Sequence, residues 1–397
     1  MSVRTGVVLA AGEGTRLRPL TRNRPKPMLP AANRPILEYV FDALLAADVE
    51  RIVVVVGYKA DRVQDHFGST YGGATLTYVQ QHKQLGSGHA LLQAREAVSG
   101  PMLVVNGDRV IDGGSVEAVI DAFETNDDTP TLAVLERPDV SQYGAIAMQA
   151  GDITELVEKP ESDQYHLING GIYAFPESIF GAISDTPRTE GELALTDTIT
   201  QRIDEGGVRG VATEGLWVDA TYPWDLLAVS REILARGRVV EPDRGDRVWV
   251  DETAIVHEDA TLDGPVVVGA DCEIGPGAVI GPNTALGRNV TIGANATVSG
   301  SVLDADARVD PGSTLIEVVT GQDVDLGANT VVPGGPADVR INDQYFQDQR
   351  LGAVFADRVT ARGNVSVSAG TLVGPNATLH AGAHVRDFIA ENAEVVR

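Results

Sequence analysis

The sequence predicts an α/β domain followed by a β-helix, and three observations support this fold class. In the N-terminal half, continuous β-branched runs such as IVVVVGY alternate with segments of helical periodicity. In the C-terminal half, aliphatic residues recur at every sixth position. A charged stretch with Gly and Pro separates the two patterns. We therefore expect domains at 1–237 and 248–397, joined by a linker at 238–247.

The composition limits the classes of protein that the chain can belong to. The formal charge of −25 argues against a nucleic-acid partner, because phosphate backbones are bound by basic surfaces. Only four lysines occur among 31 basic residues, and this acid-rich, lysine-poor composition is typical of proteins adapted to high salt. No run of about 18 apolar residues and no signal-peptide pattern is present, so we expect a cytoplasmic protein without a membrane partner.

The segment 9–30 follows the first predicted strand and combines glycines with clustered cations. It contains Gly12 and Gly14, and its basic residues are Arg16, Arg18, Arg22, Arg24 and Lys26. Glycine lets backbone N–H groups approach oxyanions closely, and the cations neutralise the remaining charge. The segment therefore predicts a polyphosphate-binding loop. It does not predict a dinucleotide fingerprint, because the third glycine of that motif would fall on Leu17.

Two aspartates come directly after predicted strands of the N-terminal half. Asp108 ends the tripeptide NGD after an apolar run at 101–105, and Asp219 ends the run LWVD. Open α/β sheets bind ligands at the carboxyl ends of their strands, and Mg²⁺ is held by one or two carboxylates together with phosphate oxygens. Both aspartates are therefore candidate Mg²⁺ ligands, and a helix cap or a turn position is the alternative for each.

Short strands predicted at 131–135, 145–148 and 153–157 add an antiparallel part to the sheet, which makes it mixed. Polar residues and a glycine lie at or beyond the ends of these strands: Gly144, Glu158, Lys159 and Asn169. Such positions suit the recognition of hydroxyl groups. Turn formation is the alternative interpretation for each of them.

The motifs LAAGEGTRLRP, QLGSGHA, NGD, VEKP and WVD resemble those of sugar-1-phosphate nucleotidylyltransferases. The resemblance is greatest to the two-domain proteins related to N-acetylglucosamine-1-phosphate uridylyltransferase/glucosamine-1-phosphate acetyltransferase and to glucose-1-phosphate thymidylyltransferase. It covers nearly the whole N-terminal half. It implies a Rossmann-like nucleotidyltransferase domain, UTP or dTTP as nucleoside triphosphate, glucose-1-phosphate or N-acetylglucosamine-1-phosphate as acceptor, and Mg²⁺ as cofactor.

The resemblance also implies a role for each matching residue. The implied catalytic residues are Arg16, Lys26 and Asp108. The implied nucleotide-binding residues are Leu9, Ala10, Ala11, Gly12, Gly14, Thr15, Gln81, Gly86 and Ser87. The sugar phosphate is expected at Gly144, Glu158, Lys159 and Asn169, and Mg²⁺ at Asp108 and Asp219. The implied reaction is an in-line attack on the α-phosphate that releases pyrophosphate without a covalent intermediate. Bacterial acetylglucosamine enzymes often have Asn where Asp219 stands, whereas thymidylyl and archaeal-type enzymes have Asp. This residue argues against a purely bacterial-type assignment, and UTP and dTTP both stay open.

The C-terminal half carries a period of six residues. Its larger aliphatic positions are Val250, Val256, Leu262, Val268, Ile274, Ile280, Leu286, Ile292 and Val298. Small or β-branched residues follow each of these at the fourth place, and Cys272 is one of them, so we expect it in the core. The repeat predicts a β-helix of stacked coils. The polar segment 333–351 interrupts the period, and loops of this kind commonly reach a neighbouring subunit.

The repeat resembles the left-handed β-helices of hexapeptide acyltransferases, which implies a homotrimer. In those acetyltransferases a histidine before an LGA turn acts as the general base, and here that position is Pro311. Proline cannot accept a proton, so acetyl transfer to glucosamine-1-phosphate is the less favoured alternative. A regulatory subunit without activity is a second alternative, which the presence of the predicted cations and carboxylates disfavours. The repeat's own histidines, His257, His380 and His384, are expected to face solvent.

Overall fold

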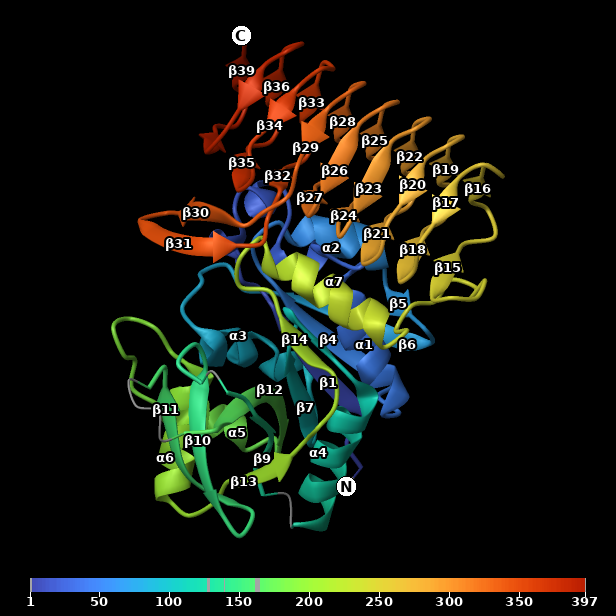
Figure 1. The fold of residues 1–397 in the computed structure, drawn as a ribbon. Coiled ribbons are helices and arrows are strands. Elements are labelled where there is room, and N and C mark those ends of the chain that lie inside the picture. Colours follow the sequence, from blue (N-terminus) through green and yellow to red (C-terminus); the bar gives the residue numbers. More distant parts are fainter. Residues whose placement is uncertain (1, 127–128, 139, 161–164, 397) are drawn as a thin grey trace. The chain divides into compact units, whose positions relative to one another are not determined.

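The computed structural model describes residues 2–126, 129–138, 140–160 and 165–396 (Figure 1). Its contacts divide the chain into two compact units. The sheet unit comprises Met1–Glu13, Pro25–Met28 and Ile36–Val218. The β-helix unit comprises Gly14–Arg24, Leu29–Pro35 and Asp219–Arg397. This division differs from the predicted ranges, because two N-terminal segments and residues 219–237 group with the C-terminal half. The predicted domain ranges, whose end residues 1 and 397 lie outside the described residues, stay a prediction.

A ten-stranded mixed sheet forms the centre of the sheet unit, in the order β10-β11-β13-β9-β12-β7-β1-β4-β6-β5. Its strands are β1 Thr5–Ala10, β4 Arg51–Val56, β5 Thr70–Tyr71, β6 Ala74–Gln80, β7 Met102–Asn106, β9 Thr131–Glu136, β10 Gly144–Gln149, β11 Asp152–Glu158, β12 Leu167–Phe175 and β13 Arg209–Ala212. Strand β1 pairs in parallel with both β4 and β7, and β12 pairs antiparallel with β7. The predicted mixed α/β sheet is confirmed.

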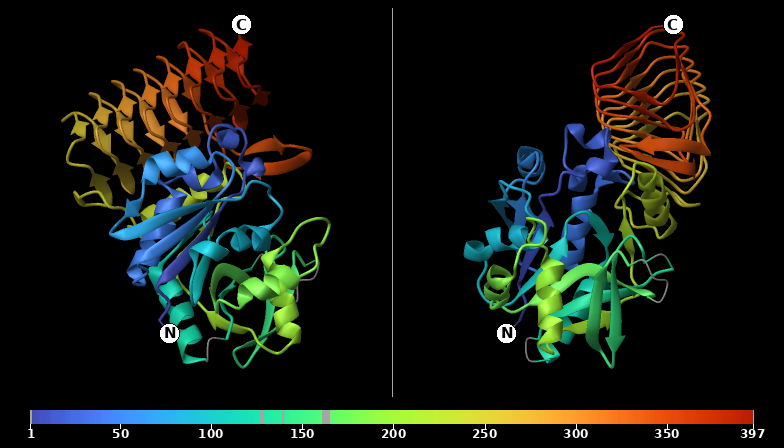
Figure 2. Two further views of the ribbon diagram at one scale, coloured as in Figure 1. Left: turned by 180° about the vertical axis from the view of Figure 1, so that it is seen from behind. Right: turned by 90° about the vertical axis from the view of Figure 1, so that its left-hand side faces the viewer.

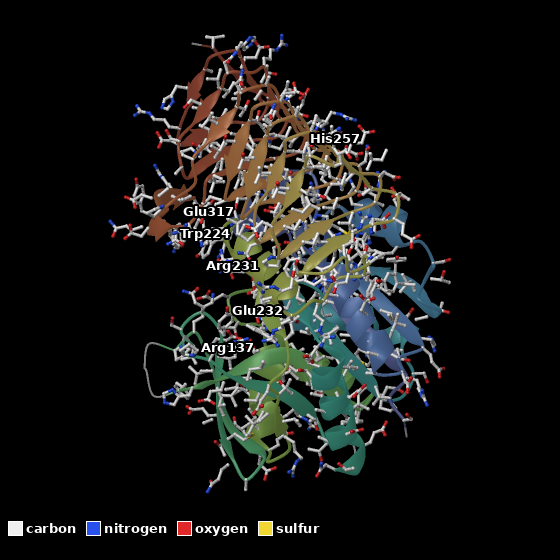
Figure 3. The ribbon with its side chains drawn as sticks, turned by 45° about the vertical axis from the view of Figure 1, so that its right-hand side comes forward. Arg137, Trp224, Arg231, Glu232, His257 and Glu317 are labelled. Atoms are coloured by element: carbon white, nitrogen blue, oxygen red, sulfur yellow. The ribbon has the colours of Figure 1, made fainter. Side chains whose placement is uncertain are left out.

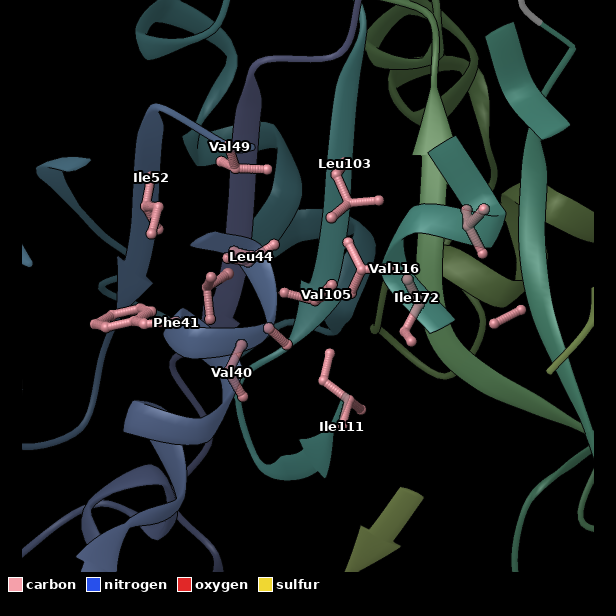
Figure 4. Close-up of a cluster of buried hydrophobic side chains, with 14 of the residues drawn as sticks. Val40, Phe41, Leu44, Val49, Ile52, Leu103, Val105, Ile111, Val116 and Ile172 are labelled. Atoms are coloured by element: carbon pink, nitrogen blue, oxygen red, sulfur yellow. The ribbon is translucent and has the colours of Figure 1, made fainter. Parts of the chain in front are cut away.

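Helices pack on both faces of this sheet. They are α1 Ile36–Ala46, α2 Ala60–Phe67, α3 Ser87–Gln93, α4 Gly113–Thr125, α5 Ile179–Asp185 and α6 Leu195–Asp204. On one face, Ile52 of β4 and Val105 of β7 pack with Phe41 of α1 and Val116 of α4 (Figure 4). On the other face, the alternate residues of the same strands pack with α3, α5 and α6. Both faces of the central strands are therefore buried, which explains their continuous β-branched runs.

Short elements connect these layers. The short strands are β2 Pro30–Ala31, β3 Arg34–Pro35, β8 Arg109–Ile111 and β14 Trp217–Asp219. The 3-10 turns are η1 Thr15–Leu17, η2 Leu20–Arg22, η3 Lys26–Met28 and η4 Arg95–Ala97. Helix α4 begins after Asp112, whose Oδ1 accepts a hydrogen bond from the N–H of Ser115 at 2.9 Å. This cap satisfies an otherwise unpaired donor at the helix N-terminus.

Three parallel sheets form a β-helix whose coils stack on one another (Figure 2). The first sheet contains β15 Val248–Val250, β18 Val266–Val268, β21 Thr284–Leu286, β24 Val302–Leu303, β27 Val318–Thr320, β32 Ala353–Phe355, β35 Thr371–Val373 and β38 Phe388–Ile389. The second contains β16 Ile255–Val256, β19 Glu273–Ile274, β22 Thr291–Ile292, β25 Arg308–Val309, β28 Asp325–Leu326, β33 Thr360–Ala361, β36 Thr378–Leu379 and β39 Glu394–Val395. The third contains β17 Thr261–Leu262, β20 Val279–Ile280, β23 Thr297–Ser299, β26 Thr314–Ile316, β29 Val331–Val332, β34 Ser366–Val367 and β37 His384–Val385.

The inward positions of the coils follow the six-residue period. Val248 lies opposite Val266 and Val266 opposite Thr284, so one coil consists of three hexapeptides. Ile274 and Ile280 are at most 2% exposed, and Cys272 is fully buried, so its predicted place in the core is confirmed. Val256 and Leu262 of the first coil are only half-buried because they lie at the end of the stack.

The first β-helix sheet is also apolar on its outer side. Trp249, Val267 and Ala285, which alternate with the inward residues, are all buried. Helix α7, Asp225–Ala235, contacts strands β21 and β24 of this sheet. The β-helix unit therefore has a second apolar layer outside its coils.

The interruption predicted at 333–351 leaves the coils as an antiparallel hairpin. Its strands are β30 Ala337–Ile341 and β31 Gln344–Gln349. The ring of Phe346 lies 4.5 Å from that of Tyr222 and 5.2 Å from that of Trp224, measured between centroids. The hairpin thus packs on its own chain, whereas its approach to a neighbouring subunit stays a prediction. Among the described residues, no helix is long and apolar enough to cross a membrane.

Candidate functional site

The carboxyl ends of β1 and β7 bring two predicted segments together. The N–H of Gly107 donates to the carbonyl of Leu9 at 2.9 Å. A Cβ atom at Gly107 would lie 2.9 Å from Val8 Cγ1 and 3.0 Å from Ala10 Cβ, so only glycine fits this approach. The tight turn after β7 therefore places Asp108 at the end of the central strands.

Asp108 forms an ion pair with Lys26, whose Nζ lies 2.9 Å from Oδ2. The Lys26 side chain is 11% exposed and that of Asp108 is 38% exposed. Burial would raise the pKa of the Asp108 carboxyl, but the positive charges of Lys26 and Arg109 hold it below its ordinary value. The structure thus places a carboxylate that stays ionised beside an ammonium group at the strand ends, where phosphate ligands bind in open α/β sheets.

The predicted nucleotide-binding stretch begins at the end of β1. The carbonyl of Ala11 accepts a hydrogen bond from Gln84 Nε2 at 3.1 Å, which ties the loop after β6 to this strand end. Leu9 and Ala10 lie in β1 itself. A Cβ atom at Gly12 would meet nothing within 4 Å. The fold therefore does not need glycine there, and the open space is consistent with a ligand that approaches the backbone.

Two predicted nucleotide-binding residues, Gln81 and Gly86, contact each other after β6. Gln81 Nε2 donates to the carbonyl of Gly86 at 3.2 Å and lies 2.9 Å from His89 Nδ1. Gly86 has φ 98°, and a Cβ atom there would lie 2.4 Å from the carbonyl oxygen of Leu193. Glycine is therefore required at this turn on two grounds, its left-handed backbone and the close approach of the Leu193 backbone.

A cavity of about 700 Å³ contains all four predicted sugar-phosphate residues. Gly144 lies opposite Glu158 in the β10–β11 pair, Lys159 follows β11, and Asn169 lies in β12. Ser87 also lines this cavity, although the sequence grouped it with the nucleotide. Its Oγ accepts a hydrogen bond from the N–H of Leu195 at 2.9 Å.

The cavity also contains residues that the sequence analysis did not assign: Asn106, Arg109 and Tyr173. Asn106 and Arg109 flank Asp108, and their position at the end of an apolar run is the signal in the sequence that points to them. Tyr173 lies inside a long buried strand, where nothing in the sequence distinguishes it from a core residue. Its hydroxyl accepts a hydrogen bond from Asn169 Nδ2 at 2.9 Å, and burial raises the pKa of its phenol.

Aromatic rings and carbonyl groups hold the cations of the cavity. The guanidinium carbon of Arg109 lies 5.0 Å from the ring centroid of Trp217, and its Nη1 donates to the carbonyl of Asn169 at 3.4 Å. Trp217 in turn donates from Nε1 to the carbonyl of Gly170 at 2.7 Å. The positive charge of Arg109 is thereby oriented by the wall of the cavity. Lys159, with φ 45°, projects from the strained turn that ends β11.

The remaining predicted site residues belong to the β-helix unit; they are Gly14, Thr15, Arg16 and Asp219. Gly14 has the left-handed conformation, with φ 67°, and precedes the exposed residues Thr15 and Arg16. Its carbonyl accepts a hydrogen bond from Thr21 Oγ1 at 2.8 Å. Asp219 Oδ2 accepts a hydrogen bond from Thr221 Oγ1 at 3.2 Å. The structure therefore does not bring these residues together with Lys26 and Asp108 within one unit.

The residues present fit a hard divalent cation that shares its coordination with a substrate. No group of three or more Asp, Glu, His or Cys side chains among the described residues could hold a metal by itself. Mg²⁺ does not need such a group, because it takes one or two carboxylates and completes its octahedron with phosphate oxygens and water. Asp108, whose pKa its cationic neighbours hold below the ordinary value, offers one such carboxylate in the sheet unit, and Asp219 stays the predicted second ligand.

Comparison with known proteins identifies both halves of the chain. Residues 5–236 match the nucleotidyl transferase family, and residues 262–389 match the GMPPB C-terminal domain. A protein of Methanococcus maripaludis named bifunctional protein GlmU is 30% identical over 394 residues, which cover 94% of this chain and 93% of that protein. The UTP–glucose-1-phosphate uridylyltransferase AglF of Haloferax volcanii is 35% identical over 55% of this chain and 92% of its own length.

Solved structures match the N-terminal part. A putative glucose-1-phosphate thymidylyltransferase of Bacillus anthracis superposes with a TM-score of 0.55 at 25% identity and covers 60% of this chain and 97% of its own. A UDP-glucose pyrophosphorylase complexed with UDP-glucose gives a TM-score of 0.54 at 22% identity, with 59% and 99% covered. The second likeness concerns the fold alone.

Proposed function

We propose a reaction for this chain, which belongs to the nucleotidyl transferase family. The protein joins a sugar 1-phosphate to the nucleotidyl group of UTP or dTTP and releases pyrophosphate. The acceptor is glucose-1-phosphate or N-acetylglucosamine-1-phosphate. The names of the relatives, which include a uridylyltransferase and a thymidylyltransferase that act on glucose-1-phosphate, support this choice of substrates.

One observation carries the proposal. The Lys26–Asp108 ion pair lies at the carboxyl ends of the central strands, and Asp108 adjoins Asn106 and Arg109, which line the 700 Å³ cavity. This gives a charged position for phosphates next to a polar compartment large enough for a sugar. Pockets of about this volume are typical of small-molecule sites. A regulatory subunit without activity would not need this ion pair.

The chain's own residues act by holding charges in place. Lys26 and Arg16 bind the phosphates that leave as pyrophosphate. Glu158 and Asn169 hold hydroxyl groups of the sugar, and Lys159 binds its phosphate. An oxygen of the sugar phosphate attacks the α-phosphorus, a new P–O bond forms, and the bond to the β-phosphate oxygen breaks. The attacking oxygen is already anionic at neutral pH, so no general base is required.

The proposed cofactor is Mg²⁺, held by Asp108 and Asp219. When bound, it would neutralise the negative charge of the triphosphate. The remaining contribution comes from the positions of the protein cations, which lower the barrier because they need no rearrangement during the reaction.

The test is a matrix of UTP, dTTP, ATP, CTP and GTP against glucose-, glucosamine- and N-acetylglucosamine-1-phosphate in molar salt with Mg²⁺. We expect pyrophosphate release with UTP or dTTP and a glucose-type acceptor, with the nucleotide sugar identified by mass spectrometry. Pyrophosphate release in no combination would contradict the proposal.

Acetyl transfer is not part of this proposal. Pro311 stands where the resemblance predicts the general base. His257 and His384 of the repeat are exposed. Figure 3 shows His257 on the exterior of the β-helix. His380 is half-buried, with its Nε2 3.4 Å from Glu394 Oε2. We expect no thiol release from acetyl-CoA with glucosamine-1-phosphate, and rapid release would restore the bifunctional alternative. We further propose a homotrimer, on the resemblance of the repeat alone, which sedimentation equilibrium tests.

A further inference from the structure

The segment Gly14–Arg24, which carries three predicted substrate-binding residues, groups with the β-helix and not with the sheet unit. Leu17 and Leu20 of this segment are 1% exposed, whereas Thr15 and Arg16 are exposed. The segment thus has a buried apolar side and an exposed polar side. A loop that binds a ligand with its exposed side needs an anchor for its buried side.

Arg24 is the anchor of this segment. It is 4% exposed, and its Nη1 and Nη2 donate to the carboxylates of Asp304 and Asp357. Asp304 follows strand β24 and Asp357 follows strand β32, so two coils of the β-helix hold one guanidinium. Burial alone would lower the pKa of Arg24, but the two carboxylates raise it above its ordinary value. The cation is therefore permanently charged and doubly paired.

The two carboxylates are themselves fixed by the coils. Asp357 Oδ1 also accepts a hydrogen bond from the N–H of Gln322 at 3.0 Å. Asp304 Oδ1 accepts from the N–H of Ala305 at 2.7 Å, and the N–H of Asp304 donates to Thr320 Oγ1 at 2.9 Å. Neither carboxylate can follow Arg24 if the segment moves, so the β-helix determines the position of the guanidinium.

The position of Arg24 is transmitted to the start of the segment. Thr21 Oγ1 donates to the carbonyl of Gly14 at 2.8 Å, and the N–H of Leu17 donates to the same carbonyl at 3.0 Å. These bonds close residues 14–21 into a compact loop, which the chain connects to Arg24 over three residues. We therefore expect a displacement at Arg24 to move this loop, and with it the exposed side chain of Arg16.

A second predicted segment is held by the same unit. The loop from Asp219 to the start of α7 carries Tyr222 and Trp224, whose rings stack at 4.9 Å and contact Phe346 of the hairpin. Asp225 Oδ2 accepts hydrogen bonds from the N–H groups of Thr221 and Tyr222. The hairpin that interrupts the repeat thus supports the loop of a predicted metal ligand.

We propose that the β-helix is a positioning device for the reaction: Arg24, held by Asp304 and Asp357, orients the phosphate-binding residues of Gly14–Arg24, and Phe346 orients the loop of Asp219. The inference rests on the proposed function and goes beyond it. In this proposal Arg24, Asp304, Asp357 and Phe346 are positioning residues, which act on the site without contacting the substrate. The hairpin that interrupts the repeat would then serve to support the loop that carries Asp219.

The first test replaces one carboxylate of the anchor. Asp357→Asn keeps the shape of the side chain but removes half of the charge pairing of Arg24. We expect the KM for the nucleoside triphosphate to rise at least tenfold, and its dissociation constant, measured by calorimetry in EDTA, to rise in parallel. The matched control is Glu391→Gln, which removes an exposed β-helix carboxylate 3.9 Å from Arg22 Nε. It should stay within twofold of the wild type.

The second test does not depend on a buried charge and keeps the inference testable if Asp357→Asn does not fold. Phe346→Ala should weaken Mn²⁺ binding, followed by electron paramagnetic resonance in the presence of nucleotide, at least fivefold. Tyr345→Ala alters the adjacent residue of the hairpin, which is 66% exposed, and should leave Mn²⁺ affinity unchanged.

The outcomes separate the two proposals. A wild-type protein without pyrophosphate release in any substrate combination would overturn the proposed function. An active wild type, with variants that lose thermal stability but keep nucleotide and Mn²⁺ affinity within twofold, would overturn the positioning role. Loss of affinity in Asp357→Asn or Phe346→Ala, with both control variants unchanged, supports it.

Discussion

In the sheet unit, strand β4 buries five consecutive residues, Ile52–Val56, whereas in the β-helix unit strand β20 buries only one of its two. Helices cover both faces of the central sheet, so neighbouring residues of β4 are equivalent. A coil of the β-helix has an inside and an outside, so Ile280 is fully buried while Val279 is 38% exposed. An aliphatic side chain therefore contributes to stability at every position of a central strand in the sheet unit, but only at inward positions of a coil in the β-helix unit.

The largest expected effect is on chemistry in the sheet unit. Asp108→Asn removes a charge at the strand ends and should lower pyrophosphate release by at least about a hundredfold, the scale of losing one preorganised electrostatic contact. Melting temperature should fall only slightly at neutral pH, because Asp108 is partly exposed and its ion pair contributes little to stability. The control is Asp121→Asn on the exposed side of α4. Undiminished turnover in Asp108→Asn would contradict the assigned site.

The next effect is on the stability of the β-helix. Ile280→Ala should lower the free energy of unfolding by about 2–5 kcal/mol, because it leaves a cavity between stacked coils. Val279→Ala, one residue away on the outside, should stay within about 0.5 kcal/mol. Chemical denaturation measures both. Equal losses at the two positions would contradict the inward and outward assignment.

The matched pair in the sheet should not show this asymmetry. Val54→Ala and Val55→Ala each remove two buried carbons from opposite faces of β4. Each should cost about 1.5–3 kcal/mol, the transfer free energy of the lost groups plus a cavity contribution. Denaturation curves that show only one position to be sensitive would mean that one face of the sheet is open.

A smaller effect concerns Cys272, whose thiol is buried in the coils. Burial raises its pKa to about 12, so almost no thiolate is present at neutral pH. We expect no reaction with an aromatic disulfide reagent in the native protein and a stoichiometric reaction after unfolding. Rapid native labelling would place the cysteine outside the core.

The smallest effect is on the pH dependence of stability. The pKa of Asp108 is held below its ordinary value, so its ion pair stabilises the fold above the unfolded pKa of about 3.9 and this contribution is lost as the pH falls through the folded pKa. The stability difference between wild type and Asp108→Asn should therefore be constant near neutrality and shrink in acid. Shrinkage at higher pH, near 6, would contradict the direction of the shift.

Much of the fold could be predicted because two periodicities are local. The six-residue repeat identified single inward residues such as Ile280 and Cys272, because residues six positions apart occupy equivalent places in the coils. The position of Asp108 at the end of a strand could also be predicted, because an apolar run ends there in a glycine and polar residues. The runs in β1, β4 and β7 showed buried strands but could not show which residue faces which helix layer.

The remaining features depend on contacts far apart in the chain. Arg24 pairs with carboxylates 280 and 333 positions away, and no sequence pattern links them. The sequence analysis placed Arg24 among the phosphate-binding cations, whereas the structure buries it in the β-helix unit. Tyr173 was missed for a similar reason, because a tyrosine in a buried strand resembles any core residue until its neighbours are known.

We propose that the positioned cations of the protein promote a single direct displacement of pyrophosphate at the α-phosphorus. The most direct measurement is the stereochemical course with a chiral α-thio analogue of the preferred nucleoside triphosphate, read by phosphorus NMR of the nucleotide sugar. A single in-line attack predicts inversion at the α-phosphorus. Retention would require two displacements and a covalent enzyme intermediate, and would contradict the account.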